Sequence, residues 1–206
     1  MIDFFFEAYR NTPVWAIALE AIAFVTGIAS VWFAKKENIL VYPVGLIGTT
    51  ITGYLLYRAE YFGDMCINFY YSLMSFYGWY KWARGAAEDH LEISRTSNKE
   101  KIAGFGMFIL TIVVILVVYR LFGTDIKTEN YFDILTSGIF FTAMWFMALK
   151  KLESWTLWII GDIIAIPLYA YRGLGMLSFQ YLIFTILAIQ AYIAWKKILN
   201  RQLPIS

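Results

Sequence analysis

The chain has 206 residues, of which 60% are apolar, 19% aromatic and only 16% charged. A soluble domain of this length would carry about a quarter charged residues. The composition therefore favours a chain solvated by lipid, with Trp and Tyr at the membrane interfaces. The net charge of +2, with no basic stretch interleaved with stacking aromatics, argues against a nucleic-acid partner.

The chain offers little material for metal or redox chemistry. Its only cysteine, Cys66, lies in an apolar segment, and its only histidine, His90, lies in a polar loop. One of each excludes an intrachain disulfide framework and provides no metal-ligand spacing or catalytic triad. We therefore predict no catalytic residue, no metal and no cofactor. The acidic N-terminus lacks the basic region of a secretory signal peptide, so the first apolar segment is expected to be retained.

Seven apolar segments are long enough to cross about 30 Å of hydrocarbon. They lie at approximately 14–34, 38–57, 61–82, 102–120, 131–149, 154–172 and 174–196. Short connections force neighbouring helices to run antiparallel. The predicted fold class is an all-α integral membrane protein with seven transmembrane helices.

Lys and Arg are distributed unevenly between the two sides of this predicted bundle. The side of the N-terminus carries five of them, namely Arg10, Arg58, Arg120, Lys127 and Arg172. The other side carries twelve, namely Lys35, Lys36, Lys81, Arg84, Arg95, Lys99, Lys101, Lys150, Lys151, Lys196, Lys197 and Arg201. The positive-inside rule places the N-terminus outside and the C-terminus in the cytoplasm.

Landmarks at the helix ends recur along the chain at a shift of about 114 residues. They are Lys35-Lys36 with Lys150-Lys151, Arg58 with Arg172, and Trp79-Tyr80-Lys81-Trp82 with Trp195-Lys196-Lys197. This shift spans four helices, an even number, so the two halves are expected to share one orientation in a 3+1+3 plan of parallel repeats. Such repeats are typical of transporters that hold substrate at the repeat interface. The alternative is chance similarity between apolar helices.

The domain boundaries follow from this plan. Residues 1–100 would form an N-terminal extracellular segment, a first three-helix bundle at about 14–82 and a cytoplasmic loop. Residues 101–123 would form a linker helix. Residues 124–206 would form the second three-helix bundle and a cytoplasmic C-terminus.

The sixth apolar segment contains an intramembrane carboxylate, Asp162, on one helical face with Trp155 and Trp158. A charge in lipid costs several kcal/mol, roughly 3 on insertion scales, so it indicates function by default. Indole faces add a stacking surface and attract cations. The pattern predicts a binding site for a flat, cationic ligand. Alternatively, the two indoles are interfacial anchors and the aspartate is a protonated packing residue.

The third segment carries a polar stripe at helical spacing that is expected to face a cavity or a partner helix. Its members are Asp64, Asn68, Tyr71 or Ser72, Ser75 and Trp79. Gln180 lies in the corresponding region of the seventh segment. We predict that Asn68, Tyr71, Ser75, Trp79 and Gln180 contribute to substrate binding. The alternative for Asn68 and Gln180 is polar contact between helices.

The second segment is rich in glycine and threonine, which normally indicates close helix packing but also leaves room for a substrate. Thr49 is the substrate-binding candidate here, beside Gly48. Pro43 and Pro167 could introduce kinks. Glu20 is a second intramembrane carboxylate, either near the outer boundary or involved in helix pairing.

At these residues the chain resembles the Pnu family of vitamin transporters over about 21–197. The resemblance rests on Tyr77-Gly78-Trp79-Tyr80-Lys81-Trp82, which ends the third segment, and on Trp155-x-x-Trp158-x-x-x-Asp162, where the family shows Asn or Asp. The stretch from Ile163 to Tyr169 matches the general character of the family.

The resemblance implies a SWEET-like pair of three-helix bundles, commonly assembled as a homotrimer, in a bacterial inner (plasma) membrane. It also implies facilitated diffusion, with the substrate trapped once a cytoplasmic kinase phosphorylates it. Family members carry nicotinamide riboside, thiamine or other nucleoside-like vitamins. Nicotinamide riboside is the first expectation and thiamine the alternative. Some nicotinamide riboside members carry Asn where this chain has Gly48 and Asp162, which weakens the first expectation.

Other protein classes fit less well. A retinal protein needs a lysine well inside the seventh helix, and none precedes Lys196 there. An intramembrane enzyme would need a nucleophile and base, and only Asp162 and Glu20 could form such a pair. A sugar carrier would gain nothing from an uncompensated carboxylate. A membrane receptor or structural protein that carries out no transport is a distant alternative.

Overall fold

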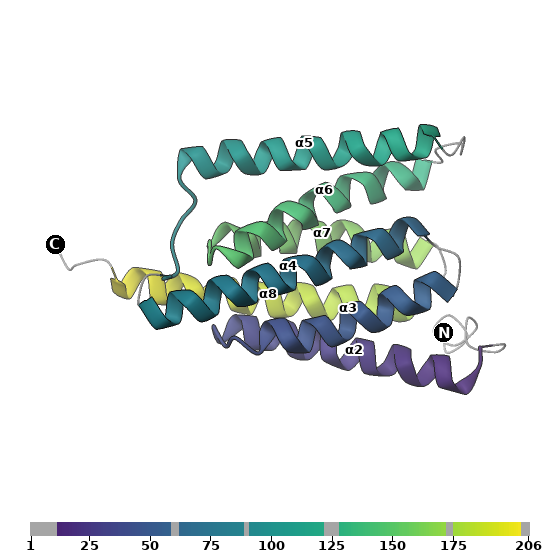
Figure 1. Ribbon diagram of the computed structural model, residues 1–206, viewed down its shortest axis with the longest axis horizontal. Coiled ribbons are helices and arrows are strands. Elements are labelled where there is room, and N and C mark those ends of the chain that lie inside the picture. Colours follow the sequence, from purple (N-terminus) through teal and green to yellow (C-terminus); the bar gives the residue numbers. More distant parts are fainter. Residues whose placement is uncertain (1–11, 59–61, 89–90, 122–127, 172–174, 203–206) are drawn as a thin grey trace.

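The computed structural model describes residues 12–58, 62–88, 91–121, 128–171 and 175–202, and these ranges are almost entirely helical (Figure 1). The helices are α2 (Val14–Lys35), α3 (Val41–Arg58), α4 (Phe62–Glu88), α5 (Asn98–Leu121), α6 (Thr128–Ala148), α7 (Glu153–Tyr171) and α8 (Gly175–Gln202). Their order matches the seven predicted segments, so the all-helical prediction is confirmed for the described ranges.

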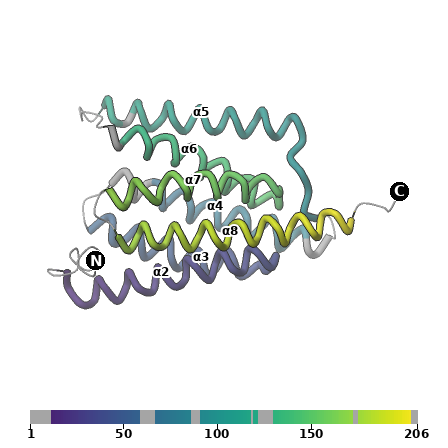
Figure 2. The backbone as a smooth tube through the Cα atoms, turned by 180° about the vertical axis from the view of Figure 1, so that it is seen from behind, coloured from purple at the N-terminus to yellow at the C-terminus, as the bar shows by residue number. Residues whose placement is uncertain are grey.

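Successive helices alternate in direction along one long axis (Figure 2). Helices α2, α3 and α4 pack side by side, as do α6, α7 and α8. The two groups meet where α2 packs on α8 and where α4 packs on α6. Helix α5 lies at the edge of the bundle against α6 (Figure 1). It presents most of its length outward.

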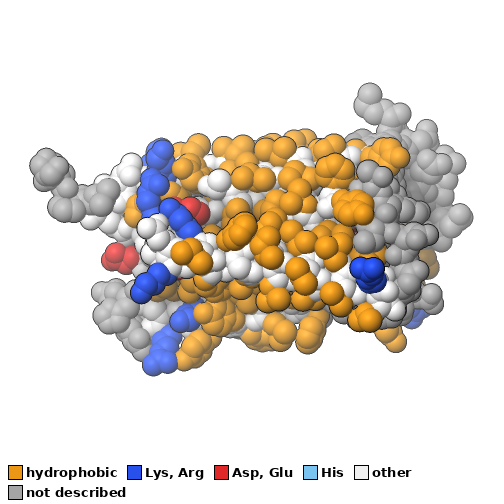
Figure 3. Space-filling view, turned by 90° about the horizontal axis from the view of Figure 1, so that it is seen from above, with side chains coloured by type: hydrophobic (Ala, Val, Ile, Leu, Met, Phe, Trp, Pro, Cys, Tyr) orange, Lys and Arg blue, Asp and Glu red, His pale blue; other side chains and the backbone are white. Residues whose placement is uncertain are grey.

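Five described helices are long and apolar enough to cross a membrane, namely α2, α5, α6, α7 and α8. Helices α3 and α4, richer in Gly, Thr, Tyr and charged residues, lie among them at the positions predicted for the second and third spans. Figure 3 shows a broad hydrophobic band, with Lys and Arg gathered mainly at one end. We call this end the basic end; it holds the α2–α3 and α6–α7 turns and the end of α8 (Figure 1).

The two turns at the basic end have the same backbone structure. Glu37 follows α2 with φ 53°, and Lys150 follows α6 with φ 50°. The amide of Asn38 donates to the carbonyl of Phe33 at 3.0 Å, and the amide of Lys151 donates to Phe146 at 2.9 Å. Each turn is therefore a Schellman-type helix end with a left-handed residue. A non-glycine residue in this conformation is uncommon, so its presence in both turns is informative.

Two tryptophans connect the helix groups just inside these turns. The Trp82 indole at the end of α4 donates to the carbonyl of Met147 at 3.3 Å. The Trp195 indole near the end of α8 donates to the carbonyl of Ala34 at 3.2 Å. The two donors, Trp82 and Trp195, are 113 positions apart, and so are the two acceptors, Ala34 and Met147, the same spacing as Glu37 and Lys150. Matching contacts thus recur at a spacing of 113 residues along the chain. The helix-end landmarks of the sequence indicated a spacing of about 114.

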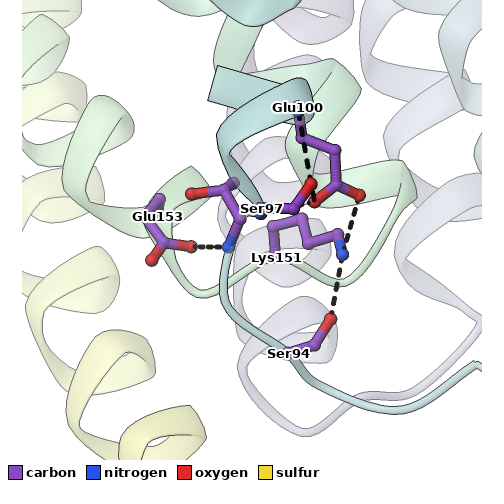
Figure 4. Close-up of polar contacts among 6 residues, drawn as sticks. Ser94, Ser97, Glu100, Lys151 and Glu153 are labelled. Atoms are coloured by element: carbon purple, nitrogen blue, oxygen red, sulfur yellow. Dashed lines mark hydrogen bonds and ion pairs between the residues drawn. The ribbon is translucent and has the colours of Figure 1, made fainter. Parts of the chain in front are cut away.

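The segment from Leu91 to Ser97 joins α4 to α5 across the basic end. Ile93 is buried at 2% exposure, and Ser94 exchanges backbone hydrogen bonds with the α6–α7 turn, from its amide to Lys150 at 3.1 Å and from Leu152 to its carbonyl at 2.9 Å. Glu153, labelled in Figure 4, accepts from the Thr96 amide at 2.9 Å. This segment therefore holds the start of α5 against the end of the bundle.

The two prolines differ in their effect on the helices. Pro43 lies in the first turn of α3, where a missing amide hydrogen leaves no helical bond unmade, so the predicted kink at Pro43 has no structural basis there. Pro167 lies inside α7. The Ser178 hydroxyl of α8 donates to the neighbouring carbonyl of Ile166 at 2.9 Å. This bond ties α7 to α8 beside the proline.

Candidate functional site

The candidate site is built on one face of α7. Trp155, Trp158 and Asp162 follow at i, i+3 and i+7, and the Asp162 side chain is only 2% exposed. The glycine before it, Gly161, lies directly against the Phe140 ring of α6, where a Cβ atom would collide. Close approach of α6 and α7 at Gly161 therefore encloses the carboxylate.

Four aromatic rings form a continuous column beside Asp162, which we call the ring column. Its members are Trp158 and Tyr169 of α7, Phe140 of α6 and Tyr181 of α8. Trp158 stacks on Phe140 with centroids 5.3 Å apart, and Phe140 stacks on Tyr181 at 6.0 Å. Tyr181 in turn stacks on Tyr169 at 5.2 Å and 7°. Stacked rings of this kind form an aromatic wall beside the carboxylate.

Tyrosine side chains lie near the carboxylate. Tyr71 of α4 and Tyr181 of α8 both interact electrostatically with Asp162 and with Tyr169. Tyr181 and Tyr169 also share a side-chain hydrogen bond. In the described part of the chain, Asp162 forms no ion pair, because the ion pairs found there join Lys150 to Glu37 and Lys151 to Glu100. A cation entering this site would meet a carboxyl group that has no Lys or Arg partner among the described residues.

A group of partly buried polar residues lies where α3 and α4 meet. The hydroxyls of Thr49 and Ser72 lie 3.0 Å apart. Asn68 lies beside Gly53, where a Cβ would approach its side chain to 3.8 Å. The Ser72 hydroxyl also donates to the Asn68 carbonyl at 3.1 Å. These contacts place Thr49 and Asn68 at the α3–α4 contact.

Two predicted residues of α4 have different settings. Tyr71 is close to Asp162, and its neighbour Tyr70 stacks on Phe141 at 3.7 Å and donates to the Phe141 carbonyl. Ser75 is buried, but its hydroxyl donates to the Tyr71 carbonyl in its own helix at 2.8 Å. Tyr71 therefore joins the site directly, whereas Ser75 supports the helix that carries it.

Three predicted site residues lie away from Asp162. Trp79 is 39% exposed on the outer surface of α4. The Gln180 amide nitrogen lies 3.2 Å from the position that a Cβ would take at Gly27 of α2, so it sits in the α2–α8 contact. Trp155 is buried two helical turns from Asp162 and meets the Trp195 ring edge-on at 5.4 Å. The structure therefore does not bring these three side chains to the carboxylate.

Sequence reasoning missed Phe140, Tyr169 and Tyr181. Tyr169 lies seven positions after Asp162, so helical periodicity alone could have placed it on the same face. Tyr181 follows Asn68 by the 113-residue spacing of the matched contacts, so the repeat could have drawn attention to it. Phe140 carried no signal, because one phenylalanine in an apolar run looks like any other. Within the described ranges, no cluster of three His, Cys, Asp or Glu side chains could hold a metal ion.

The fold and the site together define a class: a multi-pass helical membrane protein with an enclosed carboxylate beside a column of aromatic rings. Residues 17–197 match the model of a family described as nicotinamide mononucleotide transporter. The chain therefore belongs to the nicotinamide mononucleotide transporter family. The predicted resemblance to the Pnu vitamin transporters is confirmed.

Individual relatives agree with this assignment. The chain is 23% identical over 201 residues to the nicotinamide riboside transporter PnuC of Escherichia coli, covering 86% of this chain and 84% of that one. It is 26% identical over 207 residues to PnuC of Neisseria mucosa, covering 93% and 75%. It is 21% identical over 199 residues to the riboflavin/roseoflavin transporter RibM of Streptomyces davaonensis, covering 92% and 88%.

A solved structure shares the fold. The crystal structure of the vitamin B3 transporter PnuC matches with a TM-score of 0.71 and 24% identity, covering 96% of this chain and 86% of that chain. The described helices therefore adopt the arrangement of a known membrane transporter.

Proposed function

We propose that this protein takes up nicotinamide riboside across a bacterial inner (plasma) membrane by facilitated diffusion. The observation that carries the proposal is the enclosed Asp162 beside the ring column. Nicotinamide riboside has a flat pyridinium ring that carries a positive charge. Its ring can stack on aromatic faces, and its charge can neutralise a carboxylate that has no basic partner among the described residues.

The site residues of this proposal come from both helix groups. Asp162, Trp158 and Tyr71 are its central members, together with Phe140, Tyr169 and Tyr181 of the ring column. Asn68 and Thr49 would contribute hydrogen bonds from α3 and α4. Trp155, Ser75 and Gln180, which the sequence also predicted, would act indirectly by holding helices in place. Trp79, the remaining predicted residue, lies exposed on α4 and would take no part in the site.

We also propose the 3+1+3 plan with parallel repeats, in which α5 links the bundle of α2, α3 and α4 to the bundle of α6, α7 and α8. The contacts that recur at 113 residues support it. At that spacing Thr49 corresponds to Asp162, and Asn68 corresponds to Tyr181. The scaffold would then be symmetric while the site is not, with the charge contributed by one half only.

The basic end would face the cytoplasm, since that side of a membrane attracts Lys and Arg. A cytoplasmic kinase would phosphorylate the arriving vitamin. A phosphate adds about −1.5 to −2 charges at neutral pH, and this charge would meet Asp162 unfavourably. Phosphorylation would therefore prevent return. A homotrimer, as the family resemblance implies, is the assembly we expect.

Thiamine is the second candidate. Its thiazolium ring is also flat and cationic, so it suits the same carboxylate. The observation that favours it is the residue pair Gly48 and Asp162, where some nicotinamide riboside carriers have Asn. Fewer amides leave fewer groups to bind the carboxamide of nicotinamide riboside.

Calorimetric binding to the purified protein tests the proposal, with nicotinamide riboside, thiamine, riboflavin and thymidine compared at one pH. We expect nicotinamide riboside to bind at least about tenfold more tightly than the two neutral compounds, which corresponds to about 1.4 kcal/mol. Thiamine as the tightest ligand would select the alternative. Binding of neither cation would refute the charge-matching argument. Uptake into proteoliposomes separates a transporter from a receptor that only binds.

A further inference from the structure

We propose that the Glu37–Lys150 ion pair and four aromatic residues, Tyr42, Trp82, Trp155 and Trp195, form the gate that closes the basic end of the protein. We call these four residues the aromatic quartet. The inference rests on the proposed transport function, because a gate has a role only where a substrate passes. It concerns how the substrate leaves the site rather than what the substrate is.

The ion pair joins the two helix groups directly. Glu37 lies in the α2–α3 turn and Lys150 in the α6–α7 turn, and the Lys150 ammonium nitrogen is 3.2 Å from a carboxylate oxygen of Glu37. The same nitrogen lies 4.8 Å from the centre of the Trp82 ring, within cation–π range. Lys150 therefore holds both a carboxylate and an indole of the other helix group.

Beneath the ion pair, two indole hydrogen bonds and one ring contact again cross between the groups. The Trp82 indole of α4 bonds the end of α6, and the Trp195 indole of α8 bonds the end of α2. The Trp82 and Trp195 rings lie 6.2 Å apart, and each contacts one further ring of the quartet. These links must break together if the two groups separate at this end.

The aromatic quartet also blocks the way out. Its members are between 0% and 3% exposed, and all four belong to one buried hydrophobic cluster. Trp155 lies seven residues before Asp162 in α7, about 10 Å nearer the basic end at the rise of an α-helix. A substrate held at Asp162 would therefore meet the quartet on its way to that end.

Two features make this closed arrangement easy to open. The Tyr42 hydroxyl and the Trp155 indole nitrogen are buried and have no hydrogen-bond partner among the described residues. A buried unpartnered donor costs free energy that contact with water would return. These two groups therefore destabilise the closed state, and opening would remove their free-energy cost. The ion pair and the two indole bonds oppose this tendency.

A second ion pair provides a matched control. Lys151 and Glu100 lie 2.8 Å apart with side-chain exposures of 14% and 26%, compared with 15% and 26% for Lys150 and Glu37. Lys151 also donates to Ser94, as Figure 4 shows. This pair joins the α6–α7 turn to the start of α5 and does not reach α2 or α3. Its loss should leave the gate closed.

The test measures access to the quartet and needs no substrate. Ala188, 1% exposed in the same buried cluster, is changed to Cys in a chain whose own cysteine is replaced, Cys66→Ser. Inside-out vesicles are treated with a membrane-impermeant maleimide, and the labelling rate of Ala188→Cys is measured. With Glu37→Gln added, we expect labelling about fivefold faster, the size that a partly exposed ion pair supports.

Glu100→Gln, the control, should leave the labelling rate within about twofold of the parent. The exchanged pair Glu37→Lys with Lys150→Glu should return it to the same range. Equal rates for Glu37→Gln and the parent would overturn the gate, as would a fivefold increase with Glu100→Gln. Substrate binding, measured separately by calorimetry, reports on the proposed function, so the two hypotheses fail independently.

Discussion

Tyr42 and Trp155 hold equivalent positions in the two helix groups, 113 residues apart like Glu37 and Lys150. Tyr42 meets the Trp82 ring edge-on at 5.2 Å and 89°, and Trp155 meets the Trp195 ring at 5.4 Å and 89°. Both rings are buried with an unpartnered polar atom. The same edge-on contact is therefore made by a tyrosine in one helix group and a tryptophan in the other.

The charge of Asp162 should be essential for uptake of a cationic vitamin. We expect Asp162→Ala to lower uptake by more than tenfold, because removing one partner of a buried charge pair costs about 2–5 kcal/mol. Radiolabelled uptake into proteoliposomes measures it. Asp162→Asn, which keeps the shape, separates charge from hydrogen bonding. Unimpaired uptake in a folded Asp162→Ala protein would make this residue a packing residue.

Tyr181 should contribute through both its hydroxyl and its ring. Tyr181→Phe removes the bond to Tyr169 and should weaken substrate binding by roughly 0.5–1.5 kcal/mol. Tyr181→Leu also removes the stacking and should cost about 1 kcal/mol more. Dissociation constants from calorimetry measure both changes. Phe179→Leu, at a 45% exposed position of α8, is the control and should bind normally.

Gly161 should tolerate no side chain. In Gly161→Ala the new Cβ would collide with the Phe140 ring, and overpacking of this kind costs about 1–3 kcal/mol. Thermal unfolding in detergent should show a lower midpoint and weaker substrate binding. Gly106 of α5 has nothing within 4 Å of its Cβ position, so Gly106→Ala should unfold at the same or a higher temperature. A similar loss of stability in both variants would contradict this reading.

The indole bonds should stabilise the closed bundle in equal measure. Trp82→Phe and Trp195→Phe each remove the indole donor from a carbonyl that still accepts a backbone amide, so each loss should be about 0.5–1.5 kcal/mol. Both should lower the thermal midpoint of the detergent-solubilised protein. Trp79→Phe is the control, because Trp79 is 39% exposed on α4. A drop for Trp79→Phe as large as for the other two would count against the assignment.

The helices and the α7 stripe could be predicted from sequence because both follow from local rules. Hydrocarbon thickness sets the length of an apolar run, and helical periodicity alone puts Trp158 on the face of Asp162. Which side chains of a uniformly apolar or aromatic helix are buried and which are exposed could not be predicted in this way. Trp79 and Trp82 are only three residues apart, yet one is exposed and the other is 3% exposed.

The spacing of the repeat is another feature on which the sequence and the structure differ in accuracy. Basic residues at helix ends indicated a shift of about 114. Such residues lie at the membrane interface, so their exact position in the last turn of a helix is weakly constrained. The contacts at 113 residues are held by buried rings and left-handed turns, which cannot slide. Spacing read from charged landmarks is therefore less accurate than spacing read from packing.

The sequence by itself determined the membrane class, the seven helices and the buried carboxylate, because hydrophobicity and helical period act along the chain. Only the tertiary structure decided which rings stack beside Asp162 and which side chains link the two helix groups. Phe140, Tyr181 and Glu37 come from three separate parts of the chain, and their roles depend on what packs against them. That information exists only once distant helices are in contact.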